Sequence, residues 1–163
     1  MRALLPLILL TMTVPALATP LLSAPLVPTP MVFKHANDTL YSARVMLPKG
    51  LVPDPTSFDM GNPVGFKSTV LGMVMQFKLH YNPVIVITNA SVKRRAAGRT
   101  TAEVHTFPTG SVTIYTSTPA PEAGGHVTCK VDLDPARVPA RQMAAAVDRA
   151  VNTCTSLQIL GKR

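Results

Sequence analysis

The C-terminal segment from Pro139 to Leu157 constrains the fold more than any other part of the chain, because its apolar residues follow a helical period. They recur at steps of three and four, and polar side chains occupy the opposite side. The apolar positions are Met143, Val147, Ala150, Val151, Cys154 and Leu157. This spacing predicts an amphipathic helix that packs one stripe against another layer of structure.

The residues before this helix alternate between apolar and polar, which predicts β-strands that form the other layer. Thr100–Phe107 and Ser111–Ser117 flank a three-residue loop that ends in Gly110, a combination typical of a hairpin. Its register is expected to pair Val104 with Ile114 on the inner face and His105 with Thr113 on the outer face. A further strand carries Val127, Cys129, Val131 and Leu133 inward.

The first half of the chain gives weaker patterns. Tyr41–Leu47 alternates and is predicted to be a strand, and the short apolar run Pro83–Thr88 predicts a buried one. Between them, Pro48–Pro63 holds four prolines and two glycines, which favours a loop.

Residues 62–79 fit two structures. As a strand, the segment places Met73, Met75 and Phe77 on one face. As a helix, it begins with an Asn62 cap and Pro63 in the first turn, although internal glycines oppose it by about 1 kcal/mol each. We favour the helix. The predicted fold is therefore α+β: an antiparallel sheet of about four or five strands, packed on one face by the C-terminal helix, with a second helix in the first half.

The first eighteen residues have the organisation of a secretory signal. A basic Arg2 precedes the apolar run Leu4–Leu17, and the small residues Ala16 and Ala18 precede the expected cleavage point. Removal of this leader leaves 145 residues with a net charge of +7, in which 19–34 is a proline-rich extended lead-in and 35–163 a single domain. We expect a secreted or periplasmic protein, with no later segment able to cross a membrane.

Export to an oxidising compartment lets the only two cysteines, Cys129 and Cys154, form a disulfide. One lies on the inner face of a predicted strand and the other on the apolar stripe of the C-terminal helix. Packing of the two layers would bring them together. The bridge would close a loop of about 26 residues and stabilise the domain by about 3.5 kcal/mol.

Catalytic and cofactor motifs are absent from the sequence. It contains no Gly-x-Ser-x-Gly, phosphate loop, His-Glu-x-x-His or Cys-x-x-Cys motif, and no cofactor is expected. The weak catalytic candidates are Glu103 and His105, which lie two apart on one strand and could share a proton. A metal would need a third ligand such as His126, and we favour two ordinary polar residues on a solvated face. Asp132 and Asp134 are too few for a calcium loop, and Asp134 suits a turn.

A basic run is the most distinctive surface feature of the sequence. Lys93, Arg94, Arg95 and Arg99 fall within seven residues that contain no acid, and the run is expected to be the loop of a hairpin. Such a loop could bind an anionic polymer, or it could serve only to keep the surface solvated.

The composition, with 47% hydrophobic and 15% charged residues, indicates a folded core. Asn37 and Asn89 match the glycosylation pattern, which matters only in a eukaryotic secretory pathway. The sequence favours an exported, non-catalytic domain that acts by contact with an unknown protein or the envelope surface. The alternatives are a polyanion-binding module and a small secreted enzyme that uses Glu103 and His105.

Overall fold

The computed structural model describes residues 20–34, 39–55, 64–80, 89–98 and 100–163. The predicted leader 1–18, the predicted strand Pro83–Thr88, Asn37 and Arg99 lie outside these residues. The described elements, in chain order, are α1 (Pro20–Ser23), β1 (Leu26–Lys34), β2 (Leu40–Pro48), β3 (Val52–Pro53), β4 (Val64–Ser68), β5 (Met73–His80), β6 (Ser91–Ala97), β7 (Thr100–Thr106), β8 (Val112–Ala120), a 3-10 turn (Pro121–Ala123), β9 (Gly125–Leu133), α2 (Ala140–Thr155) and β10 (Gln158–Lys162).

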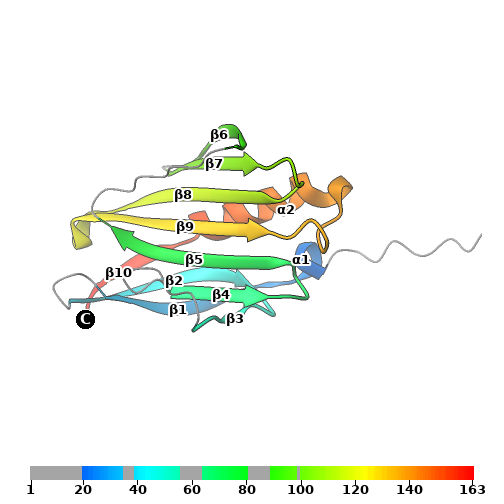
Figure 1. Ribbon diagram of the computed structural model, residues 1–163. Coiled ribbons are helices and arrows are strands. Elements are labelled where there is room, and N and C mark those ends of the chain that lie inside the picture. Colours follow the sequence, from blue (N-terminus) through cyan, green and yellow to red (C-terminus); the bar gives the residue numbers. More distant parts are fainter. Residues whose placement is uncertain (1–19, 35–38, 56–63, 81–88, 99) are drawn as a thin grey trace, which may run out of the picture.

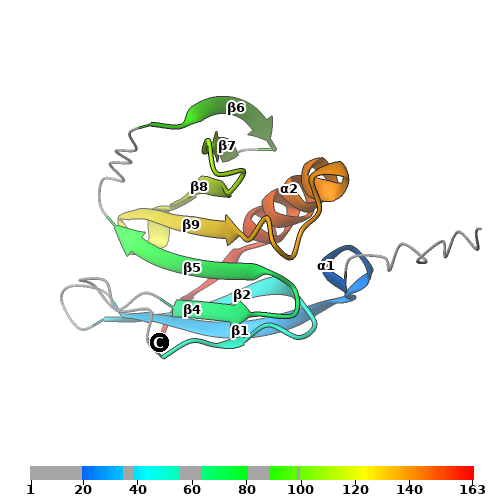
Figure 2. The same cartoon turned by 45° about the vertical axis from the view of Figure 1, so that its right-hand side comes forward.

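These strands form two antiparallel sheets (Figure 1). The larger has the order β3-β4-β5-β9-β8-β7-β6, and the smaller has the order β1-β2-β10. Both α2 and the smaller sheet lie on one side of the larger sheet, with α2 against β8 and its neighbours and β1 against β4 and β5 (Figures 1 and 2). The α+β class and the C-terminal helix are confirmed. The described sheets hold more strands than the four or five expected.

The core fills the space between the larger sheet and these two covering layers. Alternate residues of the strands enter it, and the apolar stripe of α2 closes it. Its largest fully buried side chains are Phe33, Phe77, Leu21, Leu47, Met73, Met75, Ile114 and Leu133. The opposite face of the larger sheet carries most of its polar side chains, as expected for an antiparallel sheet covered on one side.

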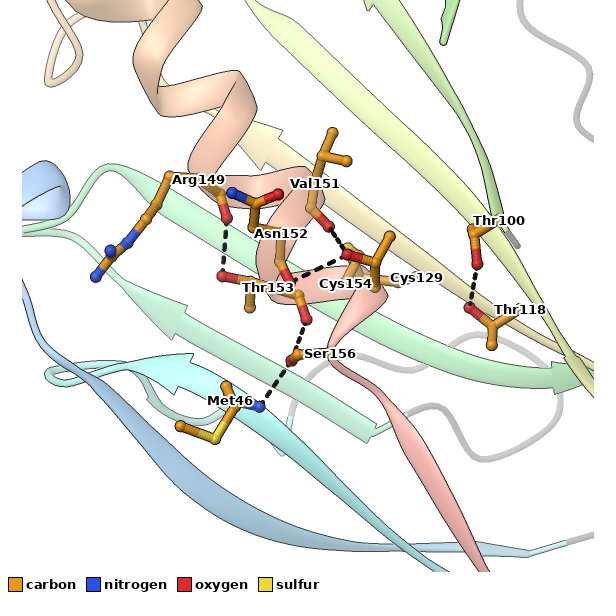
Figure 3. Close-up of a disulfide and its surroundings, with 11 residues drawn as sticks. Met46, Thr100, Thr118, Cys129, Arg149, Val151, Asn152, Thr153, Cys154 and Ser156 are labelled. Atoms are coloured by element: carbon orange, nitrogen blue, oxygen red, sulfur yellow. Dashed lines mark hydrogen bonds between the residues drawn. A yellow bond between two sulfur atoms is a disulfide. The ribbon is translucent and has the colours of Figure 1, made fainter. Parts of the chain in front are cut away.

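The predicted disulfide is present and joins the two layers (Figure 3). Cys129 of β9 and Cys154 of α2 are both buried, and their Cα atoms lie 5.7 Å apart. Just beyond the bridge, the Met46 amide donates a hydrogen bond of 2.9 Å to Ser156 Oγ. The end of α2 is therefore fixed covalently to the larger sheet and by hydrogen bonding to the smaller one.

The predicted helix over 62–79 is wrong for its described part, which forms β4 and β5. The strand alternative has the correct inner face, because Met73, Met75 and Phe77 are all buried. A turn at Gly72 separates the two strands, and this residue adopts a φ of +61° that no regular helix allows. Burial of alternate residues between the sheets outweighs the helix-start signal at Asn62 and Pro63.

Other differences concern the chain before residue 50. The lead-in forms the short helix α1 and then β1, an edge strand in which Pro28 and Pro30 are tolerated. Tyr41–Leu47 is a strand, as predicted, and its alternate residues Tyr41, Ala43, Val45 and Leu47 are buried. It belongs to the smaller sheet, however, and not to the sheet of the second half. The α1 helix was not expected from four prolines in twelve residues.

Gly72 gives a direct test of the β4–β5 turn. A Cβ at this position would lie 2.4 Å from the Arg137 Cβ atom, and the Gly72 carbonyl accepts a hydrogen bond from the Asp134 amide. We expect Gly72→Ala to lower the free energy of unfolding by about 2 kcal/mol or more, from backbone strain plus displacement of the segment before α2.

Urea titration of the Gly72→Ala variant measures this loss, and Gly98→Ala is the matched control in the same experiment. Its φ is +63°, but nothing lies within 4 Å of an added Cβ, so only the backbone cost of about 1 kcal/mol applies. Equal effects of the two substitutions would contradict the close packing of this turn on Arg137.

Candidate functional site

The basic run forms strand β6 and not the expected loop. β6 pairs with β7 in an antiparallel register that places Arg94 opposite Glu103. It ends the described order of the larger sheet, so its other side pairs with no strand in the described part of the chain. Most β6 side chains are exposed, including Val92 at 46%. Among the described strands, β6 is thus a seven-residue edge strand.

Strand geometry separates the β6 cations onto two faces. Lys93 and Arg95 lie on the side of α2, where Arg95 Nη1 is 2.6 Å from Asp148 Oδ1. Arg94 lies on the opposite face, where its Nε is 2.8 Å from Glu103 Oε1. Both ion pairs are exposed, so each is weak and its cation can exchange partners. The structure does not gather these three cations on one surface.

The open face of the sheet brings Glu103 and His105 together, as their spacing predicts. His105 Nε2 lies 3.4 Å from Glu103 Oε2, and the imidazole packs edge-on against the Tyr115 ring at a centroid distance of 5.4 Å. The confirmed register pairs His105 with Thr113, but His105 is only 4% exposed. Its Nδ1 is buried and has no hydrogen-bond partner among the described residues. A substrate could not reach that nitrogen unless the covering side chains moved.

A second polar group lies beside this histidine on the same face. Thr113 Oγ1 donates a 2.7 Å hydrogen bond to Asp132, whose other oxygen lies 2.9 Å from Lys130 Nζ. Burial raises the pKa of Tyr115, Lys130 opposes the rise and Asp132 adds to it, so the phenol is neutral at physiological pH. The predicted register already places Thr113 opposite His105, but Tyr115 was not predicted as a neighbour of His105, although the alternation of the β8 segment places Tyr115 on this face.

No metal site is evident in the part of the chain that the structure describes. There, no three histidine, cysteine, aspartate or glutamate residues converge on one point. His126 lies on β9 opposite Pro119 and its Nδ1 is 3.4 Å from Ser117 Oγ, so it does not join Glu103 and His105. Asp134 accepts a 2.8 Å hydrogen bond from the Ala136 amide, as expected for a turn residue. Asn89 is exposed and has a φ of +65°.

A groove of 550 Å³ lies between α2 and the strands β6, β7 and β8. We call it the helix groove. Val104, Val112, Met143 and Val147 contribute apolar surface to it, and Lys93, Arg95 and Asp148 stand at its polar side. The sequence does not predict this groove, because the helical period of α2 indicates only that its apolar stripe packs on the sheet.

Comparisons with known proteins identify no relative. No family model, no curated protein and no solved structure matches this chain. Among the described helices, none has the length and apolar character required to span a membrane. The residues and their geometry are therefore the basis for a functional proposal.

Proposed function

We propose that this protein is an exported, disulfide-bonded domain that acts without catalysis, by binding an extended acidic segment of a partner protein along β6. The observation that carries this proposal is the edge position of β6, a seven-residue strand whose outer side pairs with no described strand. The contact would add a strand to the larger sheet.

Two features support export. The N-terminal order of Arg2, the apolar run Leu4–Leu17 and the small residues before Thr19 is that of a secretory leader. The Cys129–Cys154 bridge is a feature that persists in oxidising compartments and is rare in the cytosol. We place the protein in the periplasm or outside the cell.

Edge strands attract other strands because they carry a row of unpaired backbone donors and acceptors. Proteins protect such edges with prolines, bulges, short strands or charged side chains, and the β1 edge of this protein contains two prolines. β6 has no proline and is protected by the charges of Lys93, Arg94 and Arg95, which repel a basic strand but attract an acidic one. An extended peptide can therefore form regular main-chain hydrogen bonds along β6, and its side chains supply specificity.

The charge of β6 defines the partner. Lys93, Arg94 and Arg95 are consecutive, so a strand added beside them would place its side chains next to cations on both faces of the sheet. A second copy of β6 would bring like charges opposite each other, which is unfavourable. An acidic segment would instead compete with Glu103 for the guanidinium group of Arg94. It would likewise compete with Asp148 for that of Arg95.

The geometry favours this contact over the two alternatives. A polyanion site would need the cations to converge, but Arg94 and Arg95 lie on opposite faces and each has an acidic partner. An enzyme that uses Glu103 and His105 would need an accessible imidazole nitrogen, but Nδ1 of His105 is buried.

Peptide selection tests the proposal. A displayed library of seven-residue peptides, selected on the protein at low salt, should be enriched in glutamate and aspartate with β-branched residues. The triple variant Lys93→Gln, Arg94→Gln and Arg95→Gln should bind a selected peptide about tenfold more weakly, because three exposed charge pairs contribute about 0.2–1 kcal/mol each. Isothermal titration at two salt concentrations measures the loss.

The control neutralises the same number of exposed cations elsewhere, at Arg141, Lys162 and Arg163. This control variant should keep the affinity of the wild-type protein. If both triple variants lose affinity equally, the attraction comes from net charge and not from β6, and the proposal fails. Selected peptides that lack acidic residues would also contradict it.

A further inference from the structure

The helix groove shares Lys93 and Arg95 with the proposed edge contact, but its apolar surface takes no part in that contact. It lies on the α2 side of β6 and β7, toward which β6 curves in Figure 2, whereas strand addition would occur at the outer edge of β6. Its volume of 550 Å³ is within the range of small-molecule sites.

Its surface is largely apolar. Among its lining residues, Val112, Val138 and Val147 are buried, whereas Val104 and Met143 are only partly buried. Ala144 is exposed and lines the groove without filling it. Small and short apolar side chains along one side of α2 therefore leave apolar surface in contact with water. Covering that surface would be favourable for a ligand with an apolar chain.

The charged residues that line the groove indicate which chemical group the polar end of such a ligand carries. Lys93, Arg95 and Asp148 line the groove, and Asp148 is paired with Arg95. Lys93 is exposed and has no acidic partner among the described residues. Among the residues that the structure describes, the polar side of the groove thus retains one positive charge without an acidic partner, which complements a single anionic group.

We infer that the helix groove binds a fatty acid, with the alkyl chain along Val104, Met143 and Val147 and the carboxylate at Lys93. The largely apolar lining disfavours a highly charged ligand such as a polyphosphate. Lys93, the one lining cation without an acidic partner in the described part of the chain, suits one carboxylate better than a neutral lipid. The apolar part of this site is formed by α2 and the inner faces of β7 and β8, so it does not depend on the contact proposed for β6, whereas Lys93 belongs to both.

Displacement of a dansyl-labelled undecanoate probe from the full chain, below the micellar range, tests the inference. Octanoate, decanoate and dodecanoate should compete with affinities that rise about fourfold for each added methylene, until the chain fills the groove. Dodecanol should compete less well than dodecanoate, because it lacks the anionic group. A failure of the wild-type protein to bind the probe, or equal affinities for all chain lengths, would overturn the inference.

Two substitutions locate the site. Ala144→Trp should fill the groove and lower dodecanoate affinity at least about tenfold, whereas Ala145→Trp, on the adjacent exposed residue outside the groove, should leave it unchanged. Lys93→Gln should lower dodecanoate affinity about threefold and leave dodecanol affinity unchanged. Equal effects of the two tryptophan substitutions would overturn the assignment of the groove.

Fatty-acid binding in the helix groove can be tested separately from peptide binding at the β6 edge. Ala144→Trp should retain binding of an acidic peptide selected on the wild-type protein, because the outer edge of β6 is unaltered. Loss of fatty-acid binding with retention of peptide binding supports the groove as a distinct site. Loss of both would overturn that distinction.

Discussion

Replacing Cys129 and Cys154 together by alanine is expected to lower the free energy of unfolding by about 3–4 kcal/mol. The bridge spans a sequence separation of 25 residues and joins the central strand β9 to α2. Its loss increases the entropy of the unfolded chain. We therefore expect the melting temperature of the double variant to be lower by about 10 °C or more, for a domain of this size. Urea titration and thermal unfolding of both proteins measure the effect.

Reduction of the wild-type protein provides the control for lost side-chain volume. The reduced protein keeps both sulfur atoms in a buried site, so its stability should fall almost as much as that of the double variant. A decrease below about 1 kcal/mol in both samples would show that the bridge contributes little, and that packing of α2 alone fixes it on the sheet.

Phe77→Ala is expected to destabilise the protein by about 3–5 kcal/mol. Phe77 is fully buried on β5 between the two sheets, and its ring meets Phe66 of β4 edge-on at a centroid distance of 6.3 Å. The substitution leaves a cavity beside Phe66 and removes the aromatic contact. Chemical denaturation measures the loss, and no decrease in the denaturant slope is expected if folding remains two-state.

Val70→Ala is the matched control, since Val70 is 68% exposed in the turn after β4. It should change the unfolding free energy by no more than about 0.5 kcal/mol. A small effect of Phe77→Ala would contradict the placement of β5 at the interface of the sheets.

The elements predicted correctly are those whose burial follows a simple period. α2 has one apolar stripe, and β7, β8 and β9 alternate because one face packs inward and the other meets solvent. The register that pairs Val104 with Ile114 follows from the three-residue loop. The disulfide follows from placing each cysteine on an inner face.

The elements that were missed depend on neighbours that a local pattern does not reveal. β6 is exposed on both faces, so it shows no alternation, and three adjacent cations suggest a loop. For β4 and β5, local helix-start signals compete with burial between two sheets, which only the tertiary fold determines. The division into two sheets rests on β1 packing against β4 and β5, far apart in sequence.

The candidate sites, too, depend on tertiary packing that a local sequence pattern does not reveal. The spacing of Glu103 and His105 predicts their proximity, but burial of the imidazole results from packing on its face of the sheet. The edge position of β6 depends on strand order, and the helix groove depends on the distance between α2 and β7. Neither property is encoded in a contiguous segment.

Amide hydrogen exchange of β6 tests most directly the central claim that an acidic segment pairs with this edge strand. In an antiparallel edge strand, alternate amides face outward and lack a ladder partner. When a selected acidic peptide saturates the protein, every second amide within Ser91–Ala97 should become protected from exchange. Saturation without added protection in β6, with changes confined to α2 or the open face of the sheet, would contradict the claim.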